Sequence, residues 1–169
     1  MAPNGRSLIR AMAVTVSNRA AAGVYEDRSG PLLVSFLEDL GCQVDGPVVV
    51  PDGEPVAEVL ADAVAAGYDV VVTTGGTGLS PTDETPEMTR RIIEREVPGI
   101  AEAIRQDGRD VVPAAVLSRG IAGTAGRTLI VNLPGSTGGV RDGMAVLGTV
   151  LRHAVDQIAG GDHPRPPQP

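Results

Sequence analysis

The chain has 169 residues, 42% hydrophobic and 21% charged, a balance typical of one globular domain with a substantial core. Its formal net charge is −7 and it contains no lysine, which argues against the basic face that general nucleic-acid binding needs. No apolar run is long enough to span a membrane, and the N-terminus does not resemble a signal peptide. We therefore expect a cytoplasmic protein that binds neither nucleic acid nor membrane, and its single cysteine, Cys42, cannot form an internal disulfide.

Strand and helix patterns alternate along the first half of the chain. Residues 8–17 predict a strand, residues 29–41 a helix with its apolar residues on one face, and residues 43–50 a second strand. An amphipathic helix follows around residues 56–64, and residues 69–74 (DVVVTT) predict a short buried strand. After a glycine-rich loop, Thr85 is the expected N-cap of the next helix and Pro86 lies in its first turn.

The second half continues this alternation with one gap. Helix is expected over residues 100–106, whereas the Gly/Ala-rich residues 113–126 give no clear prediction. Residues 127–133 predict another buried strand, and residues 140–158 a last amphipathic helix. This order indicates a three-layer α/β/α sandwich with a mostly parallel central sheet. We expect a single domain over residues 8–160, with flexible termini at residues 1–7 and 161–169.

In such sheets, ligands bind beyond the carboxyl ends of the strands, so the loops that follow strands are the candidate site. The sharpest of them is TTGGTGLSPTD, residues 73–83, whose glycines allow backbone amides to approach a phosphate. A tight turn without a ligand is the simpler alternative. The loop is not a P-loop, because that motif needs a lysine, and Pro81 breaks a G-x-G-x-x-G pattern.

Two acids occupy such loops: Asp52 follows the second strand, and Asp83 ends the glycine-rich loop. Two carboxylates that converge at a sheet edge can hold Mg²⁺ together with substrate phosphates. The alternatives are that Asp52 is only a turn residue in Pro-Asp-Gly and that Asp83 is only a local cap.

The first strand is followed by further polar candidates. Ser17 ends that strand, while Asp27 and Ser29 lead into a helix. Ser29 can equally be only an N-cap, and Asp27 can be only a solvent-exposed partner of Arg28.

Two more segments lie late in the chain. Pro134, Gly135 and Ser136 form a strand-to-helix turn that would attract an anion, unless Ser136 serves only as a helix cap. Arg119, next to Ser118, can clamp a phosphate or a pterin carbonyl, or can be an ordinary surface arginine.

Together these motifs resemble the Mog/MoaB family of molybdopterin-binding proteins over about residues 9–158. The strongest stretch is TTGGTG followed by SPTD and ETPE, residues 73–87. Supporting stretches are VSNRAAAGVYEDRSGP (residues 16–31), PD (51–52), LSR (117–119) and NLPG (132–135).

The resemblance implies a homotrimer of α/β/α subunits that binds molybdopterin and ATP with Mg²⁺. It implies transfer of AMP from ATP to molybdopterin, with Asp52 and Asp83 as catalytic acids and metal ligands and a molybdenum insertion protein as a possible partner. On this basis we assign the nucleotide to the amides of Gly75, Gly76, Thr77 and Gly78, with Gly135 and Ser136 nearby. The pterin side is assigned to Ser17, Asp27, Ser29 and Ser118, and the same site includes Gly30, Arg119 and Pro134.

Several alternatives remain at this point. Family members of the MoaB branch also carry Ser-Thr at the position of Ser136 and Thr137, and some bind without catalysing, so a molybdopterin-binding or carrier protein without turnover stays open. A scaffold module is disfavoured because no second domain or linker is evident. A competence/damage-type pyrophosphatase is disfavoured because that group's N-terminal motif is missing.

Overall fold

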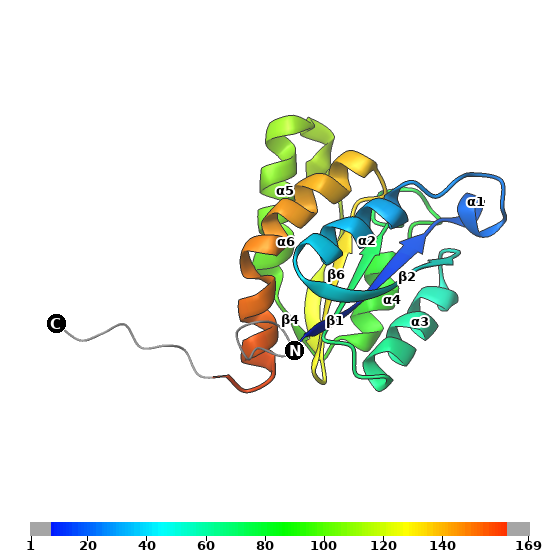
Figure 1. The fold of residues 1–169 in the computed structure, drawn as a ribbon. Helices are drawn as coiled ribbons and strands as arrows, with labels where there is room; N and C mark the ends of the chain where they lie inside the picture. Colours follow the sequence, from blue (N-terminus) through cyan, green and yellow to red (C-terminus); the bar gives the residue numbers. More distant parts are fainter. Residues whose placement is uncertain (1–7, 162–169) are drawn as a thin grey trace.

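A twisted six-stranded sheet forms the centre of the computed structural model, which describes residues 8–161 (Figure 1). The strand order is β2-β1-β3-β6-β5-β4. The strands are β1 Ile9–Val16, β2 Cys42–Val50, β3 Val70–Thr74, β4 Arg95–Glu96, β5 Ala122–Ala125 and β6 Thr128–Leu133. Strands β2, β1, β3 and β6 pair in parallel, while β5 and β4 complete one edge in antiparallel pairing.

Helices cover both faces of this sheet. They are α1 Asn18–Ala21, α2 Ser29–Asp39, α3 Glu54–Ala65, α4 Thr85–Ile92, α5 Pro98–Val111, the short 3₁₀ helix η1 Pro113–Leu117, and α6 Thr137–Ile158. Helices α2, α5 and α6 pack on one face, and α3 and α4 pack on the other. The predicted three-layer α/β/α sandwich with a mostly parallel sheet is thus confirmed.

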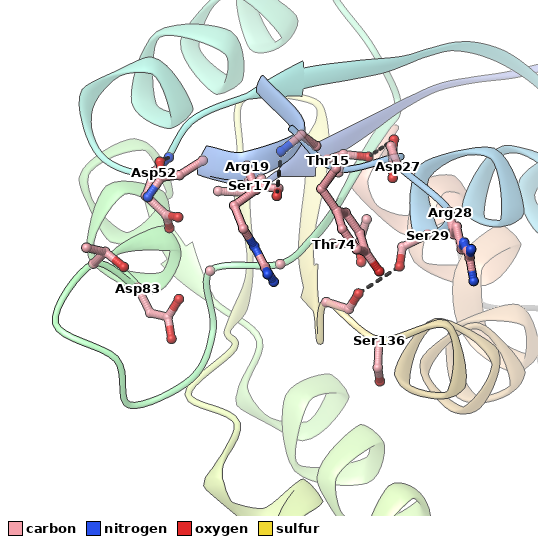
Figure 2. Close-up of a pocket in the computed structure, with 18 of the residues that line it drawn as sticks. Thr15, Ser17, Arg19, Asp27, Arg28, Ser29, Asp52, Thr74, Asp83 and Ser136 are labelled. Atoms are coloured by element: carbon pink, nitrogen blue, oxygen red, sulfur yellow. Dashed lines mark hydrogen bonds between the residues drawn. The ribbon is translucent and has the colours of Figure 1, made fainter. Parts of the chain in front are cut away.

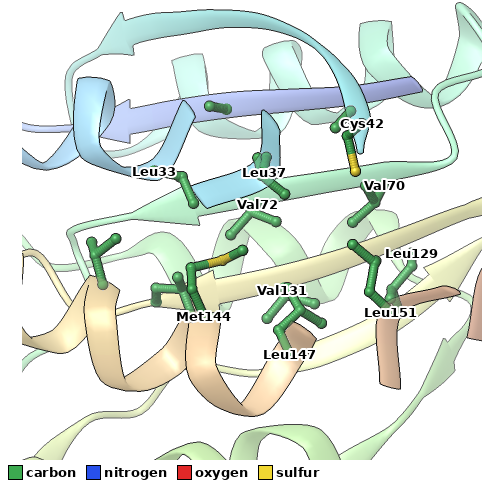
Figure 3. Packing of buried hydrophobic residues seen from close by; sticks show 14 of the residues in the cluster. Leu33, Leu37, Cys42, Val70, Val72, Leu129, Val131, Met144, Leu147 and Leu151 are labelled. Carbon is green, nitrogen blue, oxygen red and sulfur yellow. The ribbon is translucent and has the colours of Figure 1, made fainter. Parts of the chain in front are cut away.

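Alternating side chains of the central strands supply the core of both layers. In β3, Val70 and Val72 point toward α2 and α6, whereas Val71 joins the cluster under α3. Figure 3 shows the larger cluster, in which Leu37 of α2 and Leu147 of α6 meet the strands. All five residues of β3 are buried, as a strand covered on both faces requires. The sheet therefore gives the loops at its carboxyl edge a rigid base.

Residues 113–126, for which no clear prediction could be made from sequence, form η1 and β5. Helix α5 is longer than expected and extends to Val111. The prediction that Thr85 caps α4 is wrong: Glu84 is the N-cap residue, and Thr85 is the first helical residue. The backbone N–H of Thr85 donates to the carbonyl of Gly76 at 3.0 Å, and this hydrogen bond holds the first residue of α4 against the glycine-rich loop.

Two other capping expectations have opposite outcomes. Ser136 caps α6, because its Oγ accepts the N–H of Gly139 at 3.0 Å. Ser29 is not a cap, since α2 has Arg28 at its N-cap position. The flexible termini expected at residues 1–7 and 161–169 lie outside the described residues, except for residue 161. Within residues 8–161, no helix is both long and apolar enough to cross a membrane.

Candidate functional site

The carboxyl ends of β1, β2, β3 and β6 meet at one edge of the sheet, and the loops beyond them enclose a pocket of about 730 Å³ (Figure 2). Polar side chains and backbone of four separate loops line it. Of the residues predicted from sequence, this polar pocket brings together Ser17, Asp27, Ser29, Asp52, Gly75, Gly76, Asp83, Gly135 and Ser136.

A second pocket of about 660 Å³ lies on the other side of the glycine-rich loop, against α5, η1 and the start of α6. Its lining is mainly apolar and includes Ile104, Val112 and Leu117. It contains the predicted residues Thr77, Gly78, Ser118 and Pro134, and it shares Gly76, Asp83, Gly135 and Ser136 with the polar pocket. Gly30 and Arg119 line neither pocket.

The glycine-rich loop needs glycine at its first two turning positions. Gly75 has φ 104°, and a Cβ there would lie 2.2 Å from the carbonyl oxygen of Val16. Gly76 has φ 66°, and its Cβ would lie 2.1 Å from Oγ1 of Thr85. Because both positions combine left-handed backbone with close contacts, a side chain at either one would displace the loop from the strand ends.

Arg119 holds this loop from outside. Its Nε donates to the carbonyl of Gly78 at 2.8 Å, and Nη2 donates to the carbonyl of Asp83 at 2.7 Å. The guanidinium also pairs with Glu87, and the hydrogen bond from Arg119 lowers the pKa of that carboxyl. The backbone N–H of Arg119 donates to Thr77 at 2.8 Å. The guanidinium is therefore engaged with the loop, and direct ligand contact by Arg119 stays a prediction.

Asp52 stands at the end of β2 with its backbone N–H donating to Oδ1 of Asn18 at 2.9 Å. Its carboxylate Oδ1 is buried without a hydrogen-bond partner among residues 8–161. Burial raises the pKa of Asp52, and the nearby charges of Asp83 and Glu84 raise it further, while the backbone N–H of Glu84 lowers it. A cation beside this carboxylate would offset both the desolvation and the repulsion.

Asp83 lines both pockets and lies near Asp52 in the polar one (Figure 2). Its Oδ2 accepts the N–H of Ser80 at 3.1 Å, so it also fixes its own turn. Residues 8–161 contain no group of three or more His, Cys, Asp or Glu side chains arranged as metal ligands. The donor set suits an ion such as Mg²⁺, which takes one or two carboxylates and completes its shell with phosphate oxygens and water.

Asp27 and Ser29 connect the start of α2 to strand β1 and to the turn between β6 and α6. Asp27 accepts hydrogen bonds from Oγ1 of Thr15 at 2.8 Å and from the N–H of Gly30 at 2.9 Å. Ser29 donates to the carbonyl of Gly135 at 2.7 Å. The alternative of a solvent-exposed pair between Asp27 and Arg28 does not match these contacts. Gly30 has a packing reason, since its Cβ would lie 2.2 Å from Oδ2 of Asp27.

Sequence reasoning did not single out several residues that line the polar pocket, among them Asn18, Arg19 and Arg28. The side chain of Arg19 reaches into the pocket (Figure 2), and its guanidinium carbon lies 5.1 Å from the centre of the Tyr25 ring. Within residues 8–161, neither arginine forms an ion pair. The only signal for Arg19 was its place directly after the first strand, in Ser17-Asn18-Arg19.

The fold and the site define a class first. This is an α/β protein with a glycine-rich loop, two acids and two arginines that form no ion pair among residues 8–161, all at the carboxyl edge of a parallel sheet. The combination suits a phosphate-bearing ligand. The chain belongs to the family described as "Probable molybdopterin binding domain", which it matches over residues 12–153.

Named relatives agree with this family. The molybdopterin adenylyltransferase of Haemophilus influenzae is 39% identical over 142 residues, covering 80% of this chain and 71% of that protein. The molybdenum cofactor biosynthesis bifunctional protein of Synechococcus elongatus is 38% identical over 166 residues, covering 96% of this chain. The chain spans only 52% of that bifunctional protein.

Solved structures show the same fold. The Mog protein of molybdopterin biosynthesis from Mycobacterium ulcerans superposes with a TM-score of 0.87 at 51% identity. That match covers 92% of this chain and 99% of the other. The resemblance expected from the motifs at residues 16–31 and 73–87 is therefore confirmed at the level of the Mog/MoaB family.

Proposed function

We propose that this protein is a molybdopterin adenylyltransferase, which transfers AMP from ATP to molybdopterin with Mg²⁺ and releases pyrophosphate in molybdenum cofactor biosynthesis. The observation that carries the proposal is the placement of Asp52 and Asp83 beside the glycine-rich loop in the polar pocket, with Asp83 also lining the apolar pocket, so that two adjoining pockets can receive two substrates. The names of relatives such as the Haemophilus influenzae enzyme support the same activity.

The reaction joins two anions. An oxygen of the terminal phosphate of molybdopterin attacks the α-phosphorus of ATP, the new P–O bond forms, and the bond from that phosphorus to the bridging oxygen breaks. Pyrophosphate leaves with the bond electrons. Such a transfer depends mainly on positioning and on neutralising charge.

Each part of the site has a task in this scheme. Asp52 and Asp83 would hold Mg²⁺, which supplies neutralisation of phosphate charge. The N–H of Gly75 already donates to the carbonyl of Leu133 at 3.1 Å, so the amides of Gly76, Thr77 and Gly78 would orient an anionic group. Arg19 offers a positive side chain inside the polar pocket. Because the two acids flank the loop, the transferred phosphate is placed between the carboxylates and the loop amides.

The two pockets suggest which substrate lies where. The apolar pocket beside Gly76 and Gly78 suits the flat adenine ring, and the polar pocket with Ser17, Asp27 and Ser29 suits the pterin and its phosphate. Ser118 lines the apolar pocket, apart from those three residues, so we assign it to the nucleotide side instead of the pterin side.

The homotrimer, the molybdenum insertion protein as a partner and the cytoplasmic location stay predictions from the family resemblance and the composition. Light scattering on the purified protein would test the trimer. One chain has a mass of 17.3 kDa, so a measured mass that corresponds to one or two chains would contradict a trimer.

The experiment for the proposed function is turnover. Purified protein is mixed with molybdopterin, ATP and Mg²⁺, and AMP-linked pterin and pyrophosphate are assayed, with Asp83→Ala in parallel. We expect product from the wild type and its loss in the variant. Tight pterin binding without product from either protein would instead support the binding-protein alternative.

A further inference from the structure

Two buried polar atoms at the site have no hydrogen-bond partner among the described residues: Oδ1 of Asp52 and Oγ1 of Thr85. Thr85 is fully buried, with 0% of its surface exposed. Leaving a hydroxyl or a carboxylate oxygen buried and unpaired is unfavourable, so such atoms in a folded protein call for an explanation.

Both atoms face the same residue. A Cβ on Gly76 would lie 2.1 Å from Oγ1 of Thr85 and 2.6 Å from Oδ1 of Asp52. The two oxygens are therefore neighbours across the α-carbon of Gly76, in space that any side chain at this position would fill. An ionised carboxylate only accepts hydrogen bonds, whereas a threonine hydroxyl can donate one, so the two atoms are chemically complementary.

We propose that Thr85 is a positioning residue for Asp52: its hydroxyl donates a hydrogen bond to Oδ1 and fixes the orientation of this carboxylate. The inference rests on the proposed function, in which Asp52 acts on the phosphates. It assigns Gly76 a second role, because its missing side chain lets the two groups meet.

The backbone makes Thr85 suitable for this role. Its N–H donates to the carbonyl of Gly76 at 3.0 Å, and the residue begins α4, which is anchored on the sheet. Thr89, one turn further along α4, is equally buried, but its hydroxyl accepts a hydrogen bond from the side-chain amide of Asn132 at 3.0 Å. Thr89 is therefore a matched control on the same helix.

The first arm of the test measures stability without substrates. Thr85→Val keeps the shape of the side chain and removes the hydroxyl. Urea unfolding of Thr85→Val, Asp52→Ala and the double variant forms a double-mutant cycle. We expect Thr85→Val to lower the unfolding midpoint in the wild-type background and to have a clearly smaller effect in the Asp52→Ala background. A Thr85→Val protein as stable as the wild type, or more stable, would overturn the inference, since it would mean that the hydroxyl has no partner.

The second arm measures turnover. We expect Thr85→Val to reduce kcat roughly tenfold or more with the KM for ATP changed less than twofold, and Thr85→Ser to restore most of kcat. Thr89→Val should lose stability and keep kcat. Equal kcat in Thr85→Val and wild type would overturn the inference. Coupling in the unfolding cycle together with no turnover by the wild type would contradict the proposed function and leave the contact between Thr85 and Asp52 established.

Discussion

The side-chain oxygen of Asn18 accepts the backbone N–H of Asp52 at 2.9 Å and so ties the carboxyl end of β1 to that of β2. The N–H of Ser17 donates to the carbonyl of Val50 at 2.9 Å in the same junction. The backbone that carries Asp52 is therefore fixed by Ser17 and Asn18, the two residues that follow β1.

Replacing Asn18 should consequently lower catalysis. Asn18→Ala removes the acceptor, and we expect a fall in kcat of roughly tenfold, because small displacements of a catalytic group are costly. Asn18→Gln keeps an amide oxygen as acceptor without adding negative charge to the pocket, and should retain more activity than Asn18→Ala. The check is a steady-state comparison of both variants; equal losses in the two would show that the hydrogen bond to Asp52 is not what matters.

Arg19 should contribute to binding of phosphate. Its guanidinium reaches into the polar pocket and has no carboxylate partner within residues 8–161. We expect Arg19→Gln to weaken binding of molybdopterin or ATP roughly tenfold, the effect of losing one charge-assisted hydrogen bond.

Calorimetric titration with molybdopterin and with ATP separately shows which of the two ligands Arg19 binds through its phosphate. Arg127→Gln is the matched control, because Arg127 lies in the exposed turn between β5 and β6, at the opposite edge of the sheet, and the variant changes the net charge equally. Equal weakening in both variants would indicate a general charge effect instead of a contact.

Arg119 should stabilise the folded chain. Arg119→Met removes the hydrogen bonds to the carbonyls of Gly78 and Asp83, and we expect a loss of about 2 kcal/mol in the free energy of unfolding. Arg91→Met is the comparison: Arg91 pairs with Glu54 at 2.7 Å, but both side chains are more than half exposed, so we expect a clearly smaller loss than for Arg119→Met. Unchanged stability of Arg119→Met with a raised KM would instead assign Arg119 to the ligand.

The fold could be predicted where apolar patterns were strong. β3 and β6 are buried along their whole length and were visible as runs of apolar residues. β5 (AGTA) was not visible, because its small residues allow close packing: a Cβ on Gly123 would lie 2.7 Å from the carbonyl oxygen of Arg95 and 2.8 Å from Cδ1 of Ile93. The small residues of β5 are needed because residues 93–95 of the same chain approach it closely. The periodicity of apolar residues in one sequence does not show such an approach.

The candidate site was likewise predictable only in part. The loops after parallel strands could be placed together by topology, so Asp52 and Asp83 were identified as a pair. The supporting contacts were not predictable, because they join residues far apart in sequence: Asn18 and Asp52 are 34 positions apart, and Arg119 and Gly78 are 41 apart. Thr85 was assigned to a local cap because the sequence does not show the carbonyl of Gly76 that its N–H reaches.

Ionised Asp52 should reduce stability at neutral pH. Its pKa is raised in the folded protein above the ordinary value of 3.8, so the folded state holds the proton more tightly than the unfolded state does. The resulting stabilisation is fully present below the ordinary pKa and is lost as pH rises through the raised value. We therefore expect Asp52→Asn to be more stable than the wild type at pH 7, with the difference shrinking below about pH 4. Unfolding midpoints across this range are the check, and a difference that grows on acidification would contradict the sign.

The most direct test of the central claim follows the α-phosphorus of ATP. In a single turnover, excess protein with Mg²⁺ and molybdopterin is mixed with ATP labelled with ³²P at the α-position. The account predicts that the label moves to the pterin product with the wild type and stays in ATP with Asp83→Asn, which preserves the size of the side chain. Label that remains in ATP with the wild type, while molybdopterin is bound, would contradict adenylyl transfer and leave a protein that only binds the pterin.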